Sequence, residues 1–227
     1  MITTVVFDLD DTLYDEIDYC KSGFSAVSEY LSDSQPGVAS EQIFEAFWRQ
    51  FNTGNRAKVF NTALEELQIP YDERFIRELV RIYREHLPKI TLPGDSEQIL
   101  QILSAQYSLA LLTDGFLPGQ KLKVQALKIE KFFKCIVYTE ELGRQHWKPS
   151  PVGFEKILTT LKKKAENVVY IADNEKKDFI GPNKLGLKTI QLLRNKRIHT
   201  ATSDDEIARA NIRISDICEI PAILLKI

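Results

Sequence analysis

Residues 5–12 read VVFDLDDT, and this stretch decides how the rest of the chain is interpreted. The apolar run Val5–Phe7 is typical of a strand that is buried on both faces of a parallel sheet. Three carboxylates, Asp8, Asp10 and Asp11, follow it within four positions. Like charges at this spacing repel one another, and aspartate is a poor strand former. We therefore expect a function at this point that compensates for the cost.

Four further apolar runs share the character of the first, and helical patterns separate them. The predicted strands are Thr3–Phe7, Leu109–Leu112, Ile136–Tyr138, Val168–Ile171 and Thr189–Leu192. The predicted helices are Asp95–Ala105, Pro118–Leu127, Pro151–Lys163 and Lys176–Leu185. This alternation indicates the α/β class, with a doubly wound parallel sheet. Beyond about Asn195 we expect a helix that opens at Ser203 and a last edge strand within Asn211–Ile214.

The stretch between residues 16 and 88 has a different pattern. Apolar residues recur there every three to four positions, as in amphipathic helices, and turn residues gather at 32–37, 52–55 and 69–73. We expect about four helices and no strand. The predicted organisation is an α/β domain formed by residues 1–15 and 89–227, interrupted by an all-helical insertion at 16–88. Aromatic residues at helical spacing in this insertion fit either its core or a dimer surface: Phe44, Phe47, Trp48 and Phe51.

Composition excludes several classes of function. The 227 residues carry a net charge of −2, which provides no basic field for nucleic acid and no polybasic patch for a membrane. Three widely spaced cysteines argue against a disulfide framework and a structural zinc site: Cys20, Cys135 and Cys218. No apolar stretch approaches the ~20 residues of a membrane span, and no signal peptide is visible. We expect a cytoplasmic monomer or homodimer.

Polar residues follow the predicted strands at the point where each strand ends. Ligands of open parallel sheets bind beyond the carboxyl ends of the strands, so these residues should converge. They are Asp8 and Asp10 after the first strand, Thr113, Asp114 and Gly115 after the second, Lys148 in the loop after the third, and Asp173, Asn174 and Asp178 after the fourth. Several carboxylates on one rim need a cation, and oxygen ligands without histidine or cysteine favour Mg²⁺.

This combination of groups favours phosphate chemistry. Mg²⁺ and Lys148 can neutralise a phosphate, and Thr113 and backbone amides near Gly115 can donate hydrogen bonds to its oxygens. A carboxylate can attack phosphorus and form an aspartyl-phosphate. The second carboxylate, Asp10, can then protonate the leaving oxygen and later deprotonate the hydrolytic water. A small phosphorylated metabolite, such as a nucleotide or a sugar phosphate, is the expected substrate.

Four motifs in order resemble those of the haloacid dehalogenase superfamily, in its phosphatase-like branch with a C1-type helical cap. They are Asp8-Leu9-Asp10-Asp11-Thr12, Leu111–Gly115 with its terminal threonine, Lys148-Pro149, and the acidic stretch Asp173–Asp178. Each motif alone has a structural explanation as a turn, a surface loop or a helix N-terminus. Together they would require four coincidences at one sheet edge.

The resemblance implies a role for each of these residues. Asp8 would be the nucleophile and Asp10 the general acid and base, while Thr113, Asp114, Gly115 and Lys148 would bind the phosphate of the substrate. Mg²⁺ would be held by the Asp8 side chain, the Asp10 main-chain carbonyl and Asp173, with Asn174 and Asp178 in support. Two features depart from the family pattern. Ala172 replaces the usual glycine, and the segment Gly143–Lys148 is slightly long, which would bring Arg144, His146 or Trp147 to the pocket mouth.

Two other activities and one non-catalytic function are compatible with parts of this pattern. A phosphomutase of the same superfamily would share all four motifs. A dehalogenase needs no metal and typically lacks the second carboxylate, so Asp10 argues against it. A non-catalytic binding protein is disfavoured by the intact acidic set.

Overall fold

The computed structural model describes residues 1–34, 37–54 and 56–227. Two of the expected turns therefore lie partly outside the described residues, because they include Gln35, Pro36 and Asn55. The chain forms two compact units. One consists of residues 1–17 and 91–227, and the other of residues 18–90.

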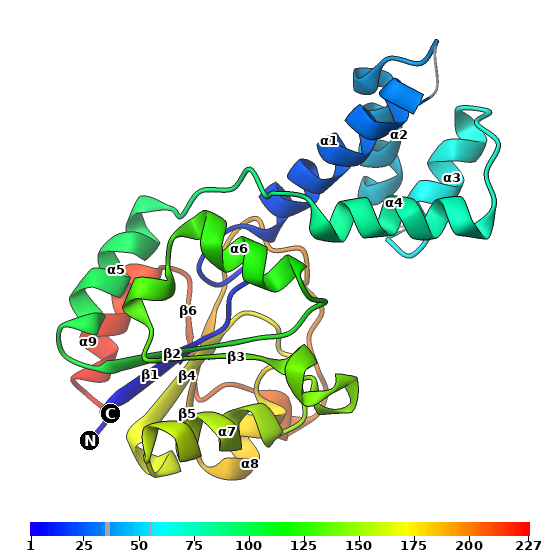
Figure 1. Cartoon of the computed structure of the whole chain (residues 1–227). Helices are drawn as coiled ribbons and strands as arrows, with labels where there is room; N and C mark the ends of the chain where they lie inside the picture. Colours follow the sequence, from blue (N-terminus) through cyan, green and yellow to red (C-terminus); the bar gives the residue numbers. More distant parts are fainter. Residues whose placement is uncertain (35–36, 55) are drawn as a thin grey trace. The chain divides into compact units, whose positions relative to one another are not determined.

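The first unit is an α/β domain, as the sequence predicted (Figure 1). Its strands are β1 (Thr4–Phe7), β2 (Ser108–Thr113), β3 (Cys135–Tyr138), β4 (Val168–Ala172), β5 (Lys188–Leu192) and β6 (Ile212–Ile214). Its helices are α5 (Gly94–Ser104), α6 (Gly119–Leu127), α7 (Val152–Leu161), α8 (Ile180–Leu185) and α9 (Ile220–Leu224).

The strands form a parallel sheet in the order β3-β2-β1-β4-β5-β6. β1 lies between β2 and β4, with Phe7 paired to Leu111 on one side and Ile171 on the other. All four residues of β1 are buried, which explains the continuous apolar pattern of this strand. This order brings the carboxyl ends of β1, β2 and β4 next to one another.

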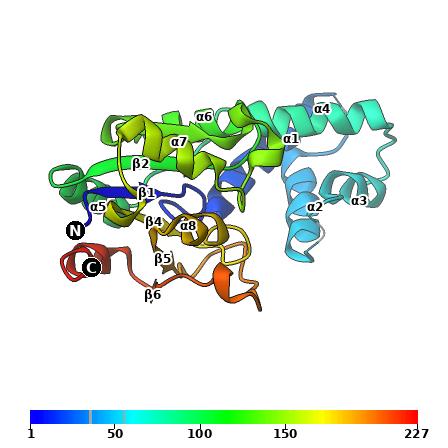
Figure 2. The ribbon, with the colours of Figure 1, turned by 90° about the horizontal axis from the view of Figure 1, so that it is seen from below.

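Helices cover both faces of the sheet, with α7 and α8 on one face and α5, α6 and α9 on the other (Figure 1). Phe154 and Ile157 of α7 pack with Val6 and Leu112 of the sheet in a buried apolar cluster. The chain termini lie close together in both views, near the amino end of β1 and away from the strand ends that carry the acidic residues (Figure 2).

Two of the predicted helices differ from the structure. α8 begins at Ile180 rather than at Lys176, because Asn174 and Asp178 close a turn through their side chains before the helix starts. The helix expected at Ser203 is reduced to a 3₁₀ turn, Glu206–Ala208. Side-chain to backbone hydrogen bonds of Ser203 and Asp205 replace the missing helical turn. The predicted last strand is present at the sheet edge as β6.

The second unit is helical throughout its described residues. It contains most of α1 (Glu16–Ser34) together with α2 (Ser40–Asn52), α3 (Val59–Glu66) and α4 (Glu73–Glu85). Phe24 of α1 contacts the rings of Phe47, Phe51 and Phe60 at centroid distances of 5.6–6.1 Å. These four rings are buried and form the core of this unit. Of the predicted aromatic positions, Phe47 and Phe51 belong to this core, whereas Phe44 and Trp48 are half-buried.

The three cysteines are free, which agrees with the expectation from their spacing. Across the described residues, no helix combines the length and the apolar character needed to cross a membrane.

Candidate active site

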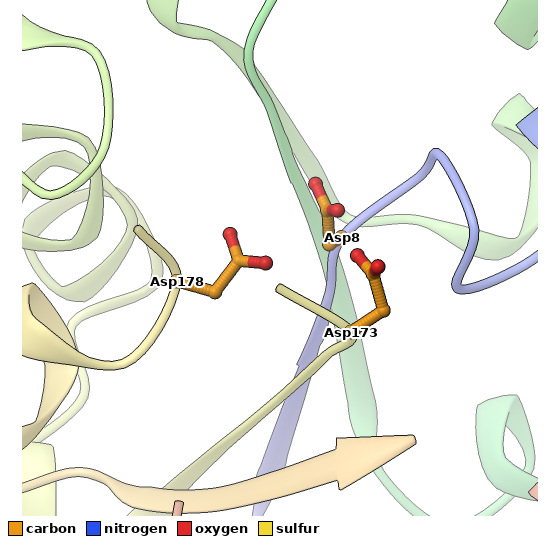
Figure 3. A group of neighbouring side chains, drawn as sticks. All are labelled: Asp8, Asp173 and Asp178. Carbon is orange, nitrogen blue, oxygen red and sulfur yellow. The ribbon is translucent and has the colours of Figure 1, made fainter. Parts of the chain in front are cut away.

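Three carboxylates gather beyond the ends of β1 and β4. Asp8 directly follows β1, Asp173 directly follows β4, and Asp178 lies five residues further on. Each contributes one oxygen to a group whose members all lie within 4.8 Å of one another. Figure 3 shows Asp8 and Asp173 side by side, with the carboxylate of Asp178 directed toward them from the next turn. The convergence follows from the sheet order, because β1 and β4 are neighbours.

Lys148 supplies the buried cation of this cluster. Its Nζ lies 2.7 Å from an Asp8 oxygen and 2.7 Å from an Asp178 oxygen, and it donates to the Tyr170 hydroxyl at 3.1 Å. Burial alone would lower the pKa of Lys148, but Asp178 and Asp8 outweigh that effect and raise it well above its ordinary value. The lysine is therefore charged and fully engaged between two carboxylates.

Asp114 holds the loop that carries Lys148. Its carboxylate accepts hydrogen bonds from the Lys148 backbone N–H at 3.2 and 3.3 Å and from the Thr139 hydroxyl at 2.7 Å. The loop after β3 is thereby anchored to the end of β2. Asp114 is one of the residues predicted to bind phosphate, and in the structure its carboxylate contacts the backbone of Lys148.

Asp173 and Asp178 differ in how their oxygens are satisfied. Asp178 accepts from Lys148 and from the Asn174 backbone N–H at 2.9 Å. Burial raises the pKa of Asp178, but the Lys148 and Lys177 charges and these hydrogen bonds outweigh it and lower the pKa. Asp173 has a buried carboxylate oxygen without a hydrogen-bond partner among the described residues. Burial, followed by the charges of Asp178 and Asp8, raises the pKa of Asp173 to about 9.

Asp8 is 3% exposed, and its ionisation depends on a balance of opposing effects. Burial raises its pKa, Lys148 lowers it and Asp178 raises it, with the result that the pKa stands at about 6. Asp8 is therefore largely ionised at neutral pH, which a carboxylate nucleophile requires. A second lysine, Lys177, lies 3.9 Å from Asp114 and is part of the same electrostatic environment.

Asp10 has hydrogen-bond partners that differ from those of Asp8, Asp173 and Asp178. It accepts hydrogen bonds from Tyr14 at 2.5 Å, from Gln120 at 2.9 Å and from Lys123 at 2.8 Å. Burial opposes ionisation of Asp10, but the Lys123 charge and the three hydrogen bonds outweigh it and lower the pKa. None of these three partners was predicted from the sequence.

Asp11 stabilises the turn that follows β1. Its backbone has a positive φ of 55°, and its carboxylate accepts from the backbone N–H groups of Glu16 and Ile198 at 2.9 and 2.6 Å. The third carboxylate of the opening motif therefore closes the turn after β1 and ties it to a distant loop. Aspartate tolerates this left-handed conformation better than most residues do.

Thr113 and Gly115 lie at the end of β2. The Thr113 hydroxyl oxygen accepts a hydrogen bond from Gln120 at 2.6 Å. Gly115 has a φ of 142°, and a Cβ atom there would lie 2.8 Å from the Gln120 Cδ. A side chain at position 115 would therefore displace Gln120.

The two departures from the family pattern are accommodated locally. Ala172 is the last residue of β4 and is fully buried. Arg144 lies over the Phe116 ring at 4.5 Å, and the rings of Phe116 and Trp147 are 5.3 Å apart. Phe116 directly follows Gly115, so this cluster lies beside the loop after β2.

The donor set suits a hard divalent cation. Asp8, Asp173 and Asp178 offer only carboxylate oxygens, and a buried oxygen of Asp173 has no hydrogen-bond partner within the described part of the chain. Carboxylates with no histidine or cysteine select Mg²⁺ or Ca²⁺ over softer metals. A bound dication would also offset the burial and the charges of Asp178 and Asp8 that raise the pKa of Asp173.

Comparison with known proteins identifies the family of this chain. The profile of the haloacid dehalogenase-like hydrolases matches residues 5–192. A glyceraldehyde 3-phosphate phosphatase of Methanocaldococcus jannaschii is 26% identical over 91% of this chain and 90% of its own length.

Two solved structures share the fold. The hydrolase YfnB of Bacillus subtilis, crystallised with magnesium, superposes with a TM-score of 0.68 at 22% identity over 98% of each chain. A 2-haloacid dehalogenase of Pseudomonas syringae superposes with a TM-score of 0.66 at 23% identity, over 100% of this chain and 99% of that one. This chain belongs to the haloacid dehalogenase-like hydrolases.

Proposed function

We propose that this hydrolase is a Mg²⁺-dependent phosphatase of small phosphorylated metabolites that works through an aspartyl-phosphate on Asp8. The observation that carries the proposal is the contact of Asp8 with Lys148 at 2.7 Å, beside an Asp173 oxygen that no described residue contacts by a hydrogen bond. The attacking carboxylate and the phosphate ester are both negatively charged and repel each other. Cations beside them reduce this repulsion, and this site offers Lys148 and carboxylates that could hold a dication. A relative named as a glyceraldehyde 3-phosphate phosphatase supports a sugar phosphate as substrate.

In the first step an oxygen of Asp8 bonds to phosphorus as the bond between phosphorus and the leaving oxygen breaks. The protonated form of Asp10 gives that oxygen its proton and becomes a carboxylate. In the second step Asp10 takes a proton from water, which attacks phosphorus and releases phosphate and Asp8. Lys148, the Thr113 hydroxyl and the Gly115 amide neutralise or bind the phosphoryl oxygens throughout.

The cation would be held by the side chains of Asp8 and Asp173 and the main-chain carbonyl of Asp10. Bound there, Mg²⁺ would supply Lewis-acid stabilisation of charge on the phosphoryl group. Asp178 has both oxygens engaged by Lys148 and Asn174, so we assign it to the support of the lysine.

We further propose that the helical insertion, residues 16–88, acts as a cap that excludes water and selects the leaving group. Hydrogen exchange should slow in residues 18–90 when Mg²⁺ and inorganic phosphate are added to the protein. Exchange that is the same with and without these ligands would contradict a closing cap.

The test of the function is a screen of phosphate esters that records free phosphate. Wild-type protein with Mg²⁺ should release phosphate from sugar phosphates or nucleotides, and excess chelator should stop the reaction until Mg²⁺ is restored. Asp8→Asn should remain folded and be inactive, because an amide is a poor nucleophile. Formation of a phosphorylated isomer without free phosphate would instead identify a mutase, and halide release from haloacids would identify a dehalogenase.

A further inference from the structure

Gln120 connects two residues that the proposed reaction uses for different purposes. It lies in the first turn of α6, is 3% exposed, and follows the loop after β2. Its side-chain nitrogen lies 2.9 Å from an Asp10 oxygen and 2.6 Å from the Thr113 hydroxyl oxygen. One amide group therefore contacts both the proposed acid–base residue and the proposed phosphate-binding hydroxyl.

The chemistry of the partners fixes which end of the amide faces them. An ionised carboxylate only accepts hydrogen bonds, so the Gln120 atom beside Asp10 has to be the NH₂ group. That group has two hydrogens. One is donated to Asp10 and the other to Thr113, which accounts for both short distances.

The Thr113 hydroxyl is consequently an acceptor toward Gln120. A hydroxyl has one hydrogen, and that hydrogen has to point away from a nitrogen that is itself donating. Thr113 is 1% exposed, and within the described part of the chain its hydroxyl donates to no acceptor. The hydrogen is left for a ligand that binds at the end of β2.

The Gln120 side chain occupies space that is open only because residue 115 is a glycine. A Cβ atom at position 115 would lie 2.8 Å from the Gln120 Cδ and 2.9 Å from its Cγ. The glycine of the second motif thus leaves room for the glutamine side chain that reaches Thr113 and Asp10.

We propose that Gln120 is a positioning residue that turns the Thr113 hydroxyl hydrogen toward the phosphoryl group of the substrate while it holds Asp10 in place. This inference rests on the proposed phosphatase function and assigns it a residue outside the four motifs. The glutamine contacts no phosphoryl oxygen in this scheme, and it acts through the threonine.

A double-mutant cycle with inorganic phosphate as the probe tests the inference. Phosphate inhibition of the Mg²⁺-loaded enzyme is measured for wild type, Gln120→Leu, Thr113→Val and the double variant. Loss of a hydrogen bond to a charged ligand should make Thr113→Val bind phosphate roughly 10- to 100-fold more weakly. Gln120→Leu alone should weaken binding by roughly 3- to 10-fold, because the hydroxyl is no longer oriented.

The decisive comparison is made without the hydroxyl. In the Thr113→Val background, Gln120→Leu should change the inhibition constant by less than about twofold, because no hydroxyl remains to orient. A merely structural role of Gln120 would weaken phosphate binding equally in both backgrounds, and that result would overturn the inference. Gln125→Leu, at an exposed position of the same helix, is the matched control and should behave as wild type.

Failure of the inference differs from failure of the proposed function. A wild-type enzyme that hydrolyses phosphate esters but gives an additive cycle would retain the function and lose the role of Gln120. A wild-type protein that neither binds phosphate nor hydrolyses any ester would contradict both. Circular dichroism and thermal unfolding of each variant identify loss of folding, and Gln120→Met, which keeps the side-chain length without a hydrogen-bond donor, replaces Gln120→Leu if the latter does not fold.

Discussion

Lys148 and Asp8 form a buried ion pair with 2.7 Å between Nζ and a carboxylate oxygen, and their side chains are 0% and 4% exposed. Removing one partner of such a pair leaves the charge of the other buried without an opposite charge beside it. Lys148→Ala should therefore destabilise the fold by roughly 3–5 kcal/mol unless Asp8 or Asp178 takes up a proton. It should also lower kcat by roughly 10²–10³-fold, as loss of a charge-stabilising group does.

Chemical denaturation and phosphate release measure these two effects separately. Lys164→Ala, at an exposed position, is the control and should change neither. A Lys148→Ala enzyme with full activity would remove the lysine from the proposed mechanism.

The acidic cluster predicts how stability depends on pH when metal is removed. The pKa of Asp173 is raised from 3.8 to about 9 and that of Asp8 from 3.8 to about 6. Between pH 3.8 and about pH 9 the folded state binds more protons than the unfolded state, so the free energy of unfolding falls as pH rises. In excess chelator, the unfolding temperature should decline from about pH 4 to about pH 9, and saturating Mg²⁺ should reduce the decline.

Asp173→Asn provides the control for this pH dependence. The amide cannot ionise, so the variant should unfold at a higher temperature than wild type in chelator at pH 8 and should lose the stabilisation by Mg²⁺. An unchanged pH profile in Asp173→Asn would show that another group is responsible, of which Glu16, with a pKa raised by burial to about 7, is the first candidate.

We expect substitution of Gly115 by alanine to strain the backbone and to lower activity. Gly115→Ala forces a side chain into a positive φ of 142° and a contact of 2.8 Å with Gln120. We expect a loss of roughly 1–3 kcal/mol of stability together with lower activity, because Gln120 has to move away from Thr113 and Asp10. Gly186→Ala is the matched control, since its φ is 81° and a Cβ atom there would lie in open space, with no described atom beyond its chain neighbours within 4 Å. It should lose stability by about 1 kcal/mol and keep full activity.

Much of the convergence at the strand ends could be predicted from the sequence. Asp8, Thr113 and Asp173 each follow a short apolar run, and parallel strands have their carboxyl ends at one edge of a sheet. The pairing of β1 with both β2 and β4 was not encoded in any local pattern, because it depends on the order of strands in the sheet. The expected start of α8 was wrong because the side chains of Asn174 and Asp178 close a turn that helical periodicity does not reveal.

The partners of Asp10 were missed, although α6 contained a signal for two of them. Gln120, Lys123, Val124 and Leu127 have the spacing of one helix face, and all four are buried. A glutamine and a lysine on the buried face of a helix need polar partners. What the sequence does not reveal is that the partner is Asp10, since α6 and the turn after β1 are more than 100 residues apart.

Asp10 is held on three sides, so its removal has a structural cost as well as a chemical one. Lys123 is paired with it at 2.8 Å, and their side chains are 5% and 17% exposed. Asp10→Ala would leave that lysine buried without its carboxylate, which is costly. Asp10→Asn keeps an oxygen acceptor for Lys123 and is the better variant for kinetics.

The Asp10→Asn variant should separate the two chemical steps. Once Asp10 has given its proton to the leaving oxygen it is ionised, and its lowered pKa favours this form, which can take a proton from water in the second step. An amide cannot do so, and hydrolysis of the aspartyl-phosphate should slow by roughly 10²–10⁴-fold. With an activated aryl phosphate, whose leaving group needs no proton, the first step should be largely spared, and phosphorylated enzyme should accumulate. Mass spectrometry after brief incubation should find phosphate on the peptide that contains Asp8. Multiple turnovers at the wild-type rate would contradict the acid–base role, because no other step in the scheme supplies a base for the water.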